Sequence, residues 1–326
     1  MTKALIIRFS SIGDIVLTTP VIRNLKTQIY GDVEIHFLTK KAFQNILTPN
    51  PYVSKVYTIE KSTNEIIEKL KDERYDYIID LHKNLRSTRV KRALKSLSFS
   101  FNKLNWQKWL LVNFGIDKLP KVHIVDRYME TLKAFGIEND NKGLDFFIQE
   151  EDRDFSIPAS HQNGFIAVGI GAAHWRKKLR VSQYVEVCKQ INYPIALLGG
   201  PSEQEEGDKI SDQFDGRVWN TAGNTSIGQS AFLIEKSKLL ITPDTGIMHI
   251  AAALKKPIIS IWGATIPGFG MYPYLNENLN KMVEASHLSK RPCSKLGTKC
   301  KYKPCKCIDE LSLPEIVETA NRQIKP

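Results

Sequence analysis

TPDTGIMHIAAAL, residues 242–254, is the most informative segment of this chain. A strand pattern over residues 238–241 leads into Asp244-Thr245-Gly246, and an alanine-rich helical pattern follows at once. With Asp244 as N-cap, Thr245 and Gly246 fall in the first helical turn, where backbone N–H groups lack intrahelical partners. These donors and the positive end of the helix dipole suit a phosphate group. The alternative interpretation is an ordinary capped strand–helix junction.

Strand and helix patterns alternate on both sides of this segment, which favours parallel sheets built from βαβ units. Residues 258–262 read as a buried strand, followed by a small-residue loop at 263–267, where open α/β sheets bind ligands. Further strands are expected at 3–9, 33–38, 75–81, 165–170 and 194–198, and helices at 14–28, 83–97, 125–135 and 181–191.

The length of 326 residues favours two domains. The polar stretch 150–163, which contains Pro158, reads as a linker. We therefore expect two Rossmann-like domains, 1–155 and 156–326, with a cleft between them. In this division the terminal helix can still pack back on the first domain.

Composition is that of a water-soluble protein, with 42% hydrophobic and 25% charged residues. No apolar run approaches the ~20 residues that cross a bilayer, and the N-terminus enters a strand directly rather than a signal peptide. We expect a cytoplasmic protein whose five cysteines are reduced.

The net charge of +11 is concentrated in two blocks. Residues 83–121 hold ten Lys or Arg and one acid, interleaved with aromatic residues, and residues 290–306 hold seven basic residues and no acid. Such blocks favour an anionic partner, which could be nucleic acid, a membrane surface or an acidic substrate. A solvated basic face is the alternative.

RFSSIGDIVLTTP, residues 8–20, is the informative segment of the first half. A strand ends there and a helix is expected from Asp14, but the loop lacks the Gly-x-Gly-x-x-Gly of a dinucleotide site. At the mouth of a cleft, the Asp14 carboxylate could act as a general base toward a substrate hydroxyl. It could equally be an acidic residue that favours the helix dipole.

Four spaced elements together carry a resemblance: Ser10-Ser11-x-Gly13-Asp14, then Gly169-Ile170-Gly171-Ala172-Ala173 with Lys177-Lys178-Leu179, then Leu198-Gly199-Gly200-Pro201-Ser202-Glu203, and Asp244-Thr245-Gly246 with His249. In this order and spacing the chain resembles glycosyltransferase family 9, which contains the ADP-heptose:lipopolysaccharide heptosyltransferases. The resemblance extends from residue 3 to about residue 320. It implies the GT-B architecture, in which two Rossmann-like domains with parallel sheets face each other across a cleft.

The resemblance also implies an inverting transfer without metal or cofactor. The donor is a nucleotide sugar, expected to be ADP-heptose, and the acceptor is a hydroxyl of an anionic lipopolysaccharide core or lipid A precursor. The basic blocks would then meet this acceptor and the anionic inner face of the cytoplasmic membrane, and nucleic acid becomes an unlikely partner.

The resemblance assigns roles to individual residues. Asp14 looks like the catalytic base and Lys177 like the catalytic lysine beside the donor diphosphate. The remaining donor-binding residues are expected to be Gly171, Lys178, Glu203 at the ribose, Asp244, Thr245, Gly246 and His249, and the acceptor-binding ones Ser11, Gly13, Lys83 and Arg86. Ala172 and Ala173 lack the hydroxyls that several relatives place there, and Arg180 stands where proline is common, which puts the donor identity in question.

Two alternatives stay open, and a third lacks support. Another nucleotide sugar could be the donor, and a non-catalytic nucleotide- or nucleic-acid-binding protein could use the same basic blocks. Ser10, Ser11 and His249 would suit a hydrolase, but no Gly-x-Ser-x-Gly elbow is present.

Four of the cysteines, Cys293, Cys300, Cys305 and Cys307, lie close together in the sequence. Their spacing of six, four and one intervening residues is not the paired C-x2-C pattern of a zinc site, and no histidine pair accompanies them. Reduced thiols in a basic loop are therefore favoured over a structural zinc, and Cys188 is expected in the core.

Overall fold

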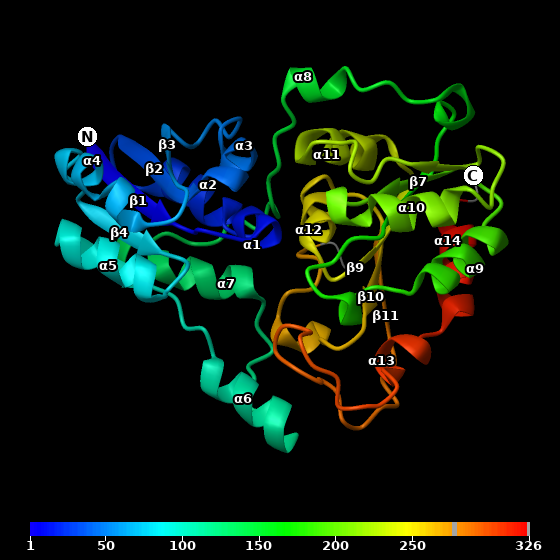
Figure 1. The fold of residues 1–326 in the computed structure, drawn as a ribbon. Helices are drawn as coiled ribbons and strands as arrows, with labels where there is room; N and C mark the ends of the chain where they lie inside the picture. The colour runs from blue at the N-terminus through cyan, green and yellow to red at the C-terminus, as the bar shows by residue number, and fades with distance from the viewer. Residues whose placement is uncertain (276–278, 325–326) are drawn as a thin grey trace. The chain divides into compact units, whose positions relative to one another are not determined.

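The computed structural model describes residues 1–275 and 279–324. The chain forms two compact units, Met1–Lys103 with Val122–Phe147, and Leu104–Lys121 with Ile148–Pro326. Each unit is built on one parallel sheet (Figure 1). The chain passes into the second unit for the last time after Phe147, somewhat before the expected boundary at residue 155.

The first unit contains five parallel strands in the order β3-β2-β1-β4-β5. These are β1 (Thr2–Ile7), β2 (Val33–Lys40), β3 (Lys55–Ile59), β4 (Tyr77–Asp80) and β5 (Leu97–Ser100). Residues 4–7 of β1 are buried, as expected of a central parallel strand covered on both faces. Because the chain builds outward on one side of β1 and then returns to place β4 on the other, a topological switch point lies between β1 and β4.

The helices of the first unit are α1 (Ile12–Val16), α2 (Thr19–Gln28), α3 (Gln44–Leu47), α4 (Ile67–Asp72), α5 (Leu85–Leu94) and α7 (Ile124–Met129). The single helix expected over residues 14–28 is therefore wrong in detail. It is two helices, and the first begins at Ile12 rather than at Asp14. Pro20 explains the break, because its ring has no N–H and would clash with the carbonyl of Val16, where α1 ends.

The second unit contains six parallel strands in the order β11-β10-β9-β6-β7-β8. They are β6 (Ile166–Gly169), β7 (Ile195–Leu198), β8 (Val218–Asn220), β9 (Leu239–Pro243), β10 (Ile258–Trp262) and β11 (Asn280–Glu284). The same reasoning places a switch point between β6 and β9.

Eight helices belong to the described part of the second unit. They are α6 (Asn105–Phe114), α8 (Glu150–Arg153), α9 (Val181–Gln190), α10 (Gln204–Ser211), α11 (Ile227–Lys236), α12 (Gly246–Ala253), α13 (Lys306–Asp309) and α14 (Leu313–Ile324). The terminal helix α14 packs on α9 and on strands β9, β10 and β11 of its own unit.

The predicted fold class, two α/β domains with parallel sheets, is confirmed, while the cleft between them stays a prediction. Along residues 1–275 and 279–324, no helix combines the length and apolarity needed to cross a membrane.

Candidate functional site

The switch point of the second unit carries an ion pair between two predicted donor-site residues. Lys177 ends the 3-10 helix Trp175–Lys177 in the loop after β6, and Asp244 follows β9. Lys177 Nζ lies 2.7 Å from Asp244 Oδ2, and Thr265 Oγ1 in the loop after β10 donates to the same oxygen at 3.1 Å. Three loops at the carboxyl ends of adjacent strands are thus joined, at the edge where such sheets bind ligands.

Helix α12 begins at Gly246 with Thr245 as its N-cap, so the expectation that Asp244 caps this helix is wrong. The physical reason is that the Asp244 carboxylate is bound by Lys177 and Thr265 instead. Residues 244–247 are partly exposed, so the amides of the first turn of α12 lie near the surface beside Lys177.

Gly169, the last residue of β6, allows β6 to approach α12. A Cβ at this position would lie 2.5 Å from Ile247 Cδ1 and 2.7 Å from Thr242 Oγ1. Contacts this short would force the neighbouring side chains to shift, so glycine favours the close approach of the strand to the start of the helix. His249, one turn into α12, is only 2% exposed and lies deeper than residues 244–247.

Glu203 lies in the loop after β7, at the end of the 3-10 helix Pro201–Glu203. Its carboxylate accepts hydrogen bonds from Gly200 N at 3.0 Å and Ser202 Oγ at 2.9 Å. A Cβ on Gly171 would lie 3.1 Å from Glu203 Oε2, so Gly171 leaves space beside this carboxylate. Lys178 Nζ is 2.5 Å from Glu206 Oε2 and 3.8 Å from Glu203 Oε1. Lys178 therefore joins the Glu203 group rather than the Lys177–Asp244 pair.

Asp14 lies in α1, after β1 of the first unit. Its carboxylate pairs with Arg8 Nη2 at 2.6 Å and accepts from Ser11 Oγ at 2.9 Å and Ser11 N at 3.2 Å. Burial by itself raises the pKa of Asp14, but the charge of Arg8 and the Ser11 hydrogen bonds outweigh burial, so this pKa lies below the ordinary value of 3.8. Of the predicted acceptor-binding residues, Ser11 thus contacts Asp14, while Gly13 is buried within α1.

Arg8 is a site residue that sequence reasoning missed. Its guanidinium is buried and also donates from Nη1 to Leu81 O at 2.5 Å and to Tyr128 Oη at 3.0 Å, and from Nε to Ser10 O at 2.8 Å. Arg8 thereby connects the turns after β1 and β4, the two strands that flank the switch point. The available signal was a charged residue immediately after a buried strand, at a sheet edge where ligands bind.

Lys83 and Arg86 lie in and just after the turn between β4 and α5. Lys83 N donates to the buried Asp80 at 2.7 Å and its side chain is exposed, while the Arg86 guanidinium lies 5.2 Å from the centre of the Phe9 ring. His82, also missed, packs edge-on against Phe9. Burial above all, and then the charge of Arg8, lower the pKa of His82 to about 4.

The first unit therefore gathers Ser11, Asp14, Lys83 and Arg86 around one switch point, where Arg8 is paired with Asp14. The second unit gathers Lys177, Asp244, Thr245 and Gly246 around the other. Gly171, Lys178 and Glu203 lie in the loops beside that second group, after β6 and β7.

Comparisons with known proteins agree along most of the chain. The family model described as glycosyltransferase family 9 (heptosyltransferase) matches residues 63–304. The lipopolysaccharide core heptosyltransferase OpsX of Haemophilus influenzae is 23% identical, with 96% of this chain and 94% of that protein covered.

Two solved structures share the fold. The glycosyl transferase family 9 protein from Veillonella parvula has a TM-score of 0.78 at 20% identity, over 99% of this chain and 97% of that one. The ADP-heptose LPS heptosyltransferase II of E. coli has a TM-score of 0.75 at 21% identity, over 99% and 98%.

Proposed function

Because the chain belongs to glycosyltransferase family 9, we propose that this glycosyltransferase moves heptose from ADP-heptose to a hydroxyl of a lipopolysaccharide core or lipid A precursor. The observation that carries the proposal is the Lys177–Asp244 pair beside the exposed start of α12, at the switch point of the second unit. A cation and a set of free backbone amides at one sheet edge are what a nucleoside diphosphate requires.

In the proposed donor complex the diphosphate lies on the amides of Gly246 and Ile247, within reach of Lys177. Glu203 accepts hydrogen bonds from the ribose hydroxyls in the space that Gly171 leaves open. As the bond from the anomeric carbon to the diphosphate breaks, negative charge grows on the leaving ADP. Lys177 and the helix dipole stabilise this charge, so the proposed reaction requires no metal ion and no cofactor.

The first unit supplies the acceptor side of the proposal. Asp14 takes the proton of the acceptor hydroxyl, and the oxygen attacks the anomeric carbon on the face opposite the departing diphosphate, which inverts that centre. Lys83 and Arg86 attract the anionic groups of the acceptor. Arg8 holds the carboxylate of Asp14 in place and ionised.

We further propose that the protein acts in the cytoplasm, bound peripherally to the inner face of the cytoplasmic membrane through α6. Trp106, Trp109 and Phe114 are 65%, 46% and 62% exposed, and Trp109 contacts both other rings. The opposite side of α6 is held on the second unit by the buried Leu111 and by Lys108, whose Nζ lies 5.5 Å from the centre of the Phe269 ring. Exposed aromatic residues on an anchored helix in a basic block suit an anionic lipid surface.

Calorimetric titration with ADP, GDP, UDP and ADP-heptose tests the donor assignment. We expect ADP and ADP-heptose to bind and the other two nucleotides to bind much more weakly, followed by transfer of heptose to a lipid A–Kdo precursor. Preference for UDP or GDP would replace the sugar nucleotide, and the absence of binding by folded protein would contradict the proposal.

A further inference from the structure

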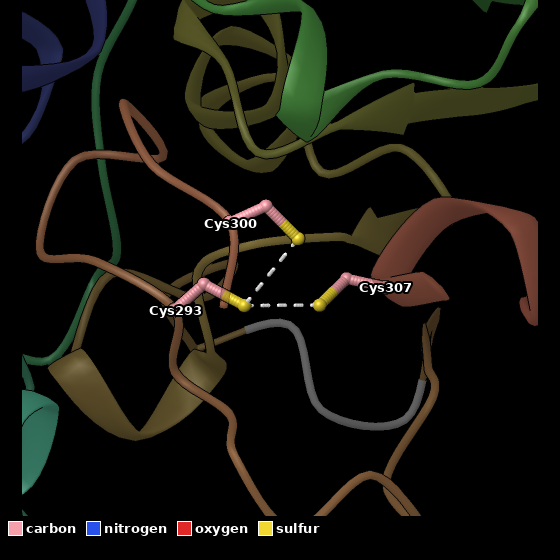
Figure 2. Close-up of side chains that lie close together, drawn as sticks. All are labelled: Cys293, Cys300 and Cys307. Atoms are coloured by element: carbon pink, nitrogen blue, oxygen red, sulfur yellow. Dashed lines mark hydrogen bonds between the residues drawn. The ribbon is translucent and has the colours of Figure 1, made fainter. Parts of the chain in front are cut away.

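The cysteines between residues 293 and 307 meet in space although their spacing does not suggest it. Cys293 Sγ lies 3.1 Å from Cys307 Sγ and 3.9 Å from Cys300 Sγ (Figure 2). The three sulfur atoms all lie within 4.8 Å of one another. Cys307 lies in α13, and the other two lie in the preceding loop.

This arrangement has the dimensions of a metal–thiolate centre. Four sulfurs placed about 2.3 Å from a tetrahedral zinc ion lie about 3.8 Å from one another. The Cys293–Cys300 separation of 3.9 Å matches this value, and the Cys293–Cys307 separation of 3.1 Å is shorter than it. Thiols packed only as small apolar groups would face carbon atoms, whereas these three point at a common centre (Figure 2).

We propose that Cys293, Cys300 and Cys307 bind one zinc ion as thiolates, with Cys305 as the fourth ligand. Each thiol releases its proton to solvent as its bond to zinc forms. Soft thiolate donors in tetrahedral geometry favour zinc over the hard cations that prefer oxygen.

Cys305 is placed to complete the set. It is 5% exposed and is the N-cap of α13, next but one to Cys307. Cys305 belongs to the same buried cluster as Cys293 and Cys307, and Cys300 packs against that cluster.

The surroundings compensate the charge of four thiolates. Seven basic residues and no acid occur between residues 290 and 306. The backbone N–H of Lys301 donates to the Cys293 sulfur.

A metal ion would also stabilise a part of the chain that has little regular structure. Residues 285–305, all of which the structure describes, form neither helix nor strand. Ordered loops of this length without regular structure are uncommon unless they have a function. One ion bound to four side chains closes the loop and compensates for the missing backbone ladder.

The loop held in this way contacts the Lys177 segment. A Cβ on Gly297 would lie 2.7 Å from Lys177 Cγ, and Arg176 Nη1 donates to Thr298 O at 3.0 Å. Gly297 and Thr298 lie between Cys293 and Cys300 in the chain. The zinc site is therefore a positioning site for Lys177; this consequence rests on the proposed function, whereas the metal binding does not.

The test uses the full-length protein, purified with a reductant and without chelator, and measures its metal content by elemental analysis. We expect about one zinc per chain in the wild type and in Cys188→Ala, which removes a buried cysteine of the same unit outside the cluster. Cys307→Ala and the more exposed Cys300→Ala should each reduce the zinc content at least tenfold.

Cobalt substitution of the wild type gives a second readout that needs no variant. Thiolate-to-cobalt charge-transfer bands with intense d–d bands are expected for a tetrahedral thiolate site. The proposal would be overturned if the protein held no zinc and cobalt gave no such bands. It would also be overturned by iron in place of zinc, by a Cys293–Cys307 disulfide that persists under reductant, or by an equal loss of zinc in Cys188→Ala.

Binding of ADP separates the metal site from its positioning role. Removal of zinc by a chelator should weaken ADP binding several-fold, and restored zinc should recover it. Zinc binding without any change in ADP affinity would overturn the positioning role alone. A protein that binds zinc but no nucleotide would contradict the proposed function and leave the metal site standing.

Discussion

In its proposed role as general base, Asp14 must be ionised to accept a proton, and its contact with Arg8 favours the ionised form. A 2.6 Å pair with a buried guanidinium and two hydrogen bonds from Ser11 outweigh the cost of burying the carboxylate. The same contacts make Asp14 a weaker base than a free carboxylate, because a lower pKa reduces the driving force for proton transfer. We infer that position, more than basicity, is what Arg8 supplies.

Replacing Asp14 by Asn should lower kcat for transfer by about 10²–10⁴ because the general base is lost. The affinity for ADP should change less than about twofold, since the proposed donor residues all lie in the second unit. Steady-state transfer kinetics and ADP titration measure the two quantities. Normal turnover by Asp14→Asn would refute the base assignment.

Replacing Arg8 by Gln should change the pH dependence of transfer. In the wild type the pKa of Asp14 lies below 3.8, so the active carboxylate is ionised and kcat/KM should be flat between about pH 5 and 7. In Arg8→Gln the charge of Arg8 no longer offsets the burial of the Asp14 carboxylate, so the pKa of Asp14 rises. Activity is then lost as pH falls through the raised pKa, and the rate at pH 5 drops relative to the rate at pH 7. Because Arg8 also contacts Leu81 and Tyr128, Tm is measured alongside, and Arg8→Lys should restore part of the profile. An unchanged profile in folded Arg8→Gln would count against this role.

Lys177 is expected to act on the diphosphate rather than on the nucleoside. Lys177→Ala should weaken ADP binding about 10- to 100-fold, the value of one charged hydrogen bond, and leave adenosine binding unchanged. It should also lower transfer, because the leaving group loses its cation. Lys189→Ala, an exposed lysine on α9, is the matched control. Equal losses for adenosine and ADP would indicate a structural role instead.

At the level of elements, the central strands could be predicted and the edge strands could not. Sequence patterns identified the seven interior strands of the two sheets, but β3, β5, β8 and β11 were missed, and each is an edge strand. Interior strands of a parallel sheet are apolar on both faces and appear as continuous hydrophobic runs. Edge strands carry polar and charged residues, as in LSFS of β5 and NKMVE of β11, so their patterns resemble loops.

Gly169→Ala tests the close approach of β6 to α12. The added Cβ meets Ile247 and Thr242 at 2.5 and 2.7 Å, so we expect a loss of about 1–3 kcal/mol in the free energy of unfolding. Because the start of α12 must shift, ADP binding should weaken as well. Gly268→Ala, whose Cβ comes no closer than 3.3 Å to the flexible Ile266 side chain, is the control. Denaturant unfolding and ADP titration of both variants would show whether this packing matters for the donor site.

At the level of the whole molecule, each unit has one sheet, one switch point and one group of polar residues at that point. The net charge of +11 and the exposed aromatic residues of α6 add a surface that suits an anionic membrane. In the proposed peripheral binding, the basic residues would attract such a membrane at long range and the aromatic rings would enter its interface.

Membrane binding is measured by sedimentation with lipid vesicles. The wild type should bind vesicles that contain phosphatidylglycerol, bind phosphatidylcholine vesicles much more weakly, and dissociate as salt rises. Joint replacement of Trp106 and Trp109 by Ala should weaken vesicle binding at least several-fold, with no change in ADP affinity. Equal binding to both lipids, or no binding, would contradict the peripheral location.

The amino-acid sequence alone determined the α/β class, the candidate site loops and the resemblance to a glycosyltransferase family. It could do so because strands, turns and the starts of helices leave short-range patterns in the sequence. Which loops meet depended on strand order, and strand order is a long-range property. Only the tertiary structure shows that Lys177 pairs with Asp244, that Thr245 is the N-cap of α12, and that Arg8 pairs with Asp14. It likewise brought together three cysteines whose spacing argued against a cluster, because a loop without regular structure folds back on itself over distances that no local pattern records.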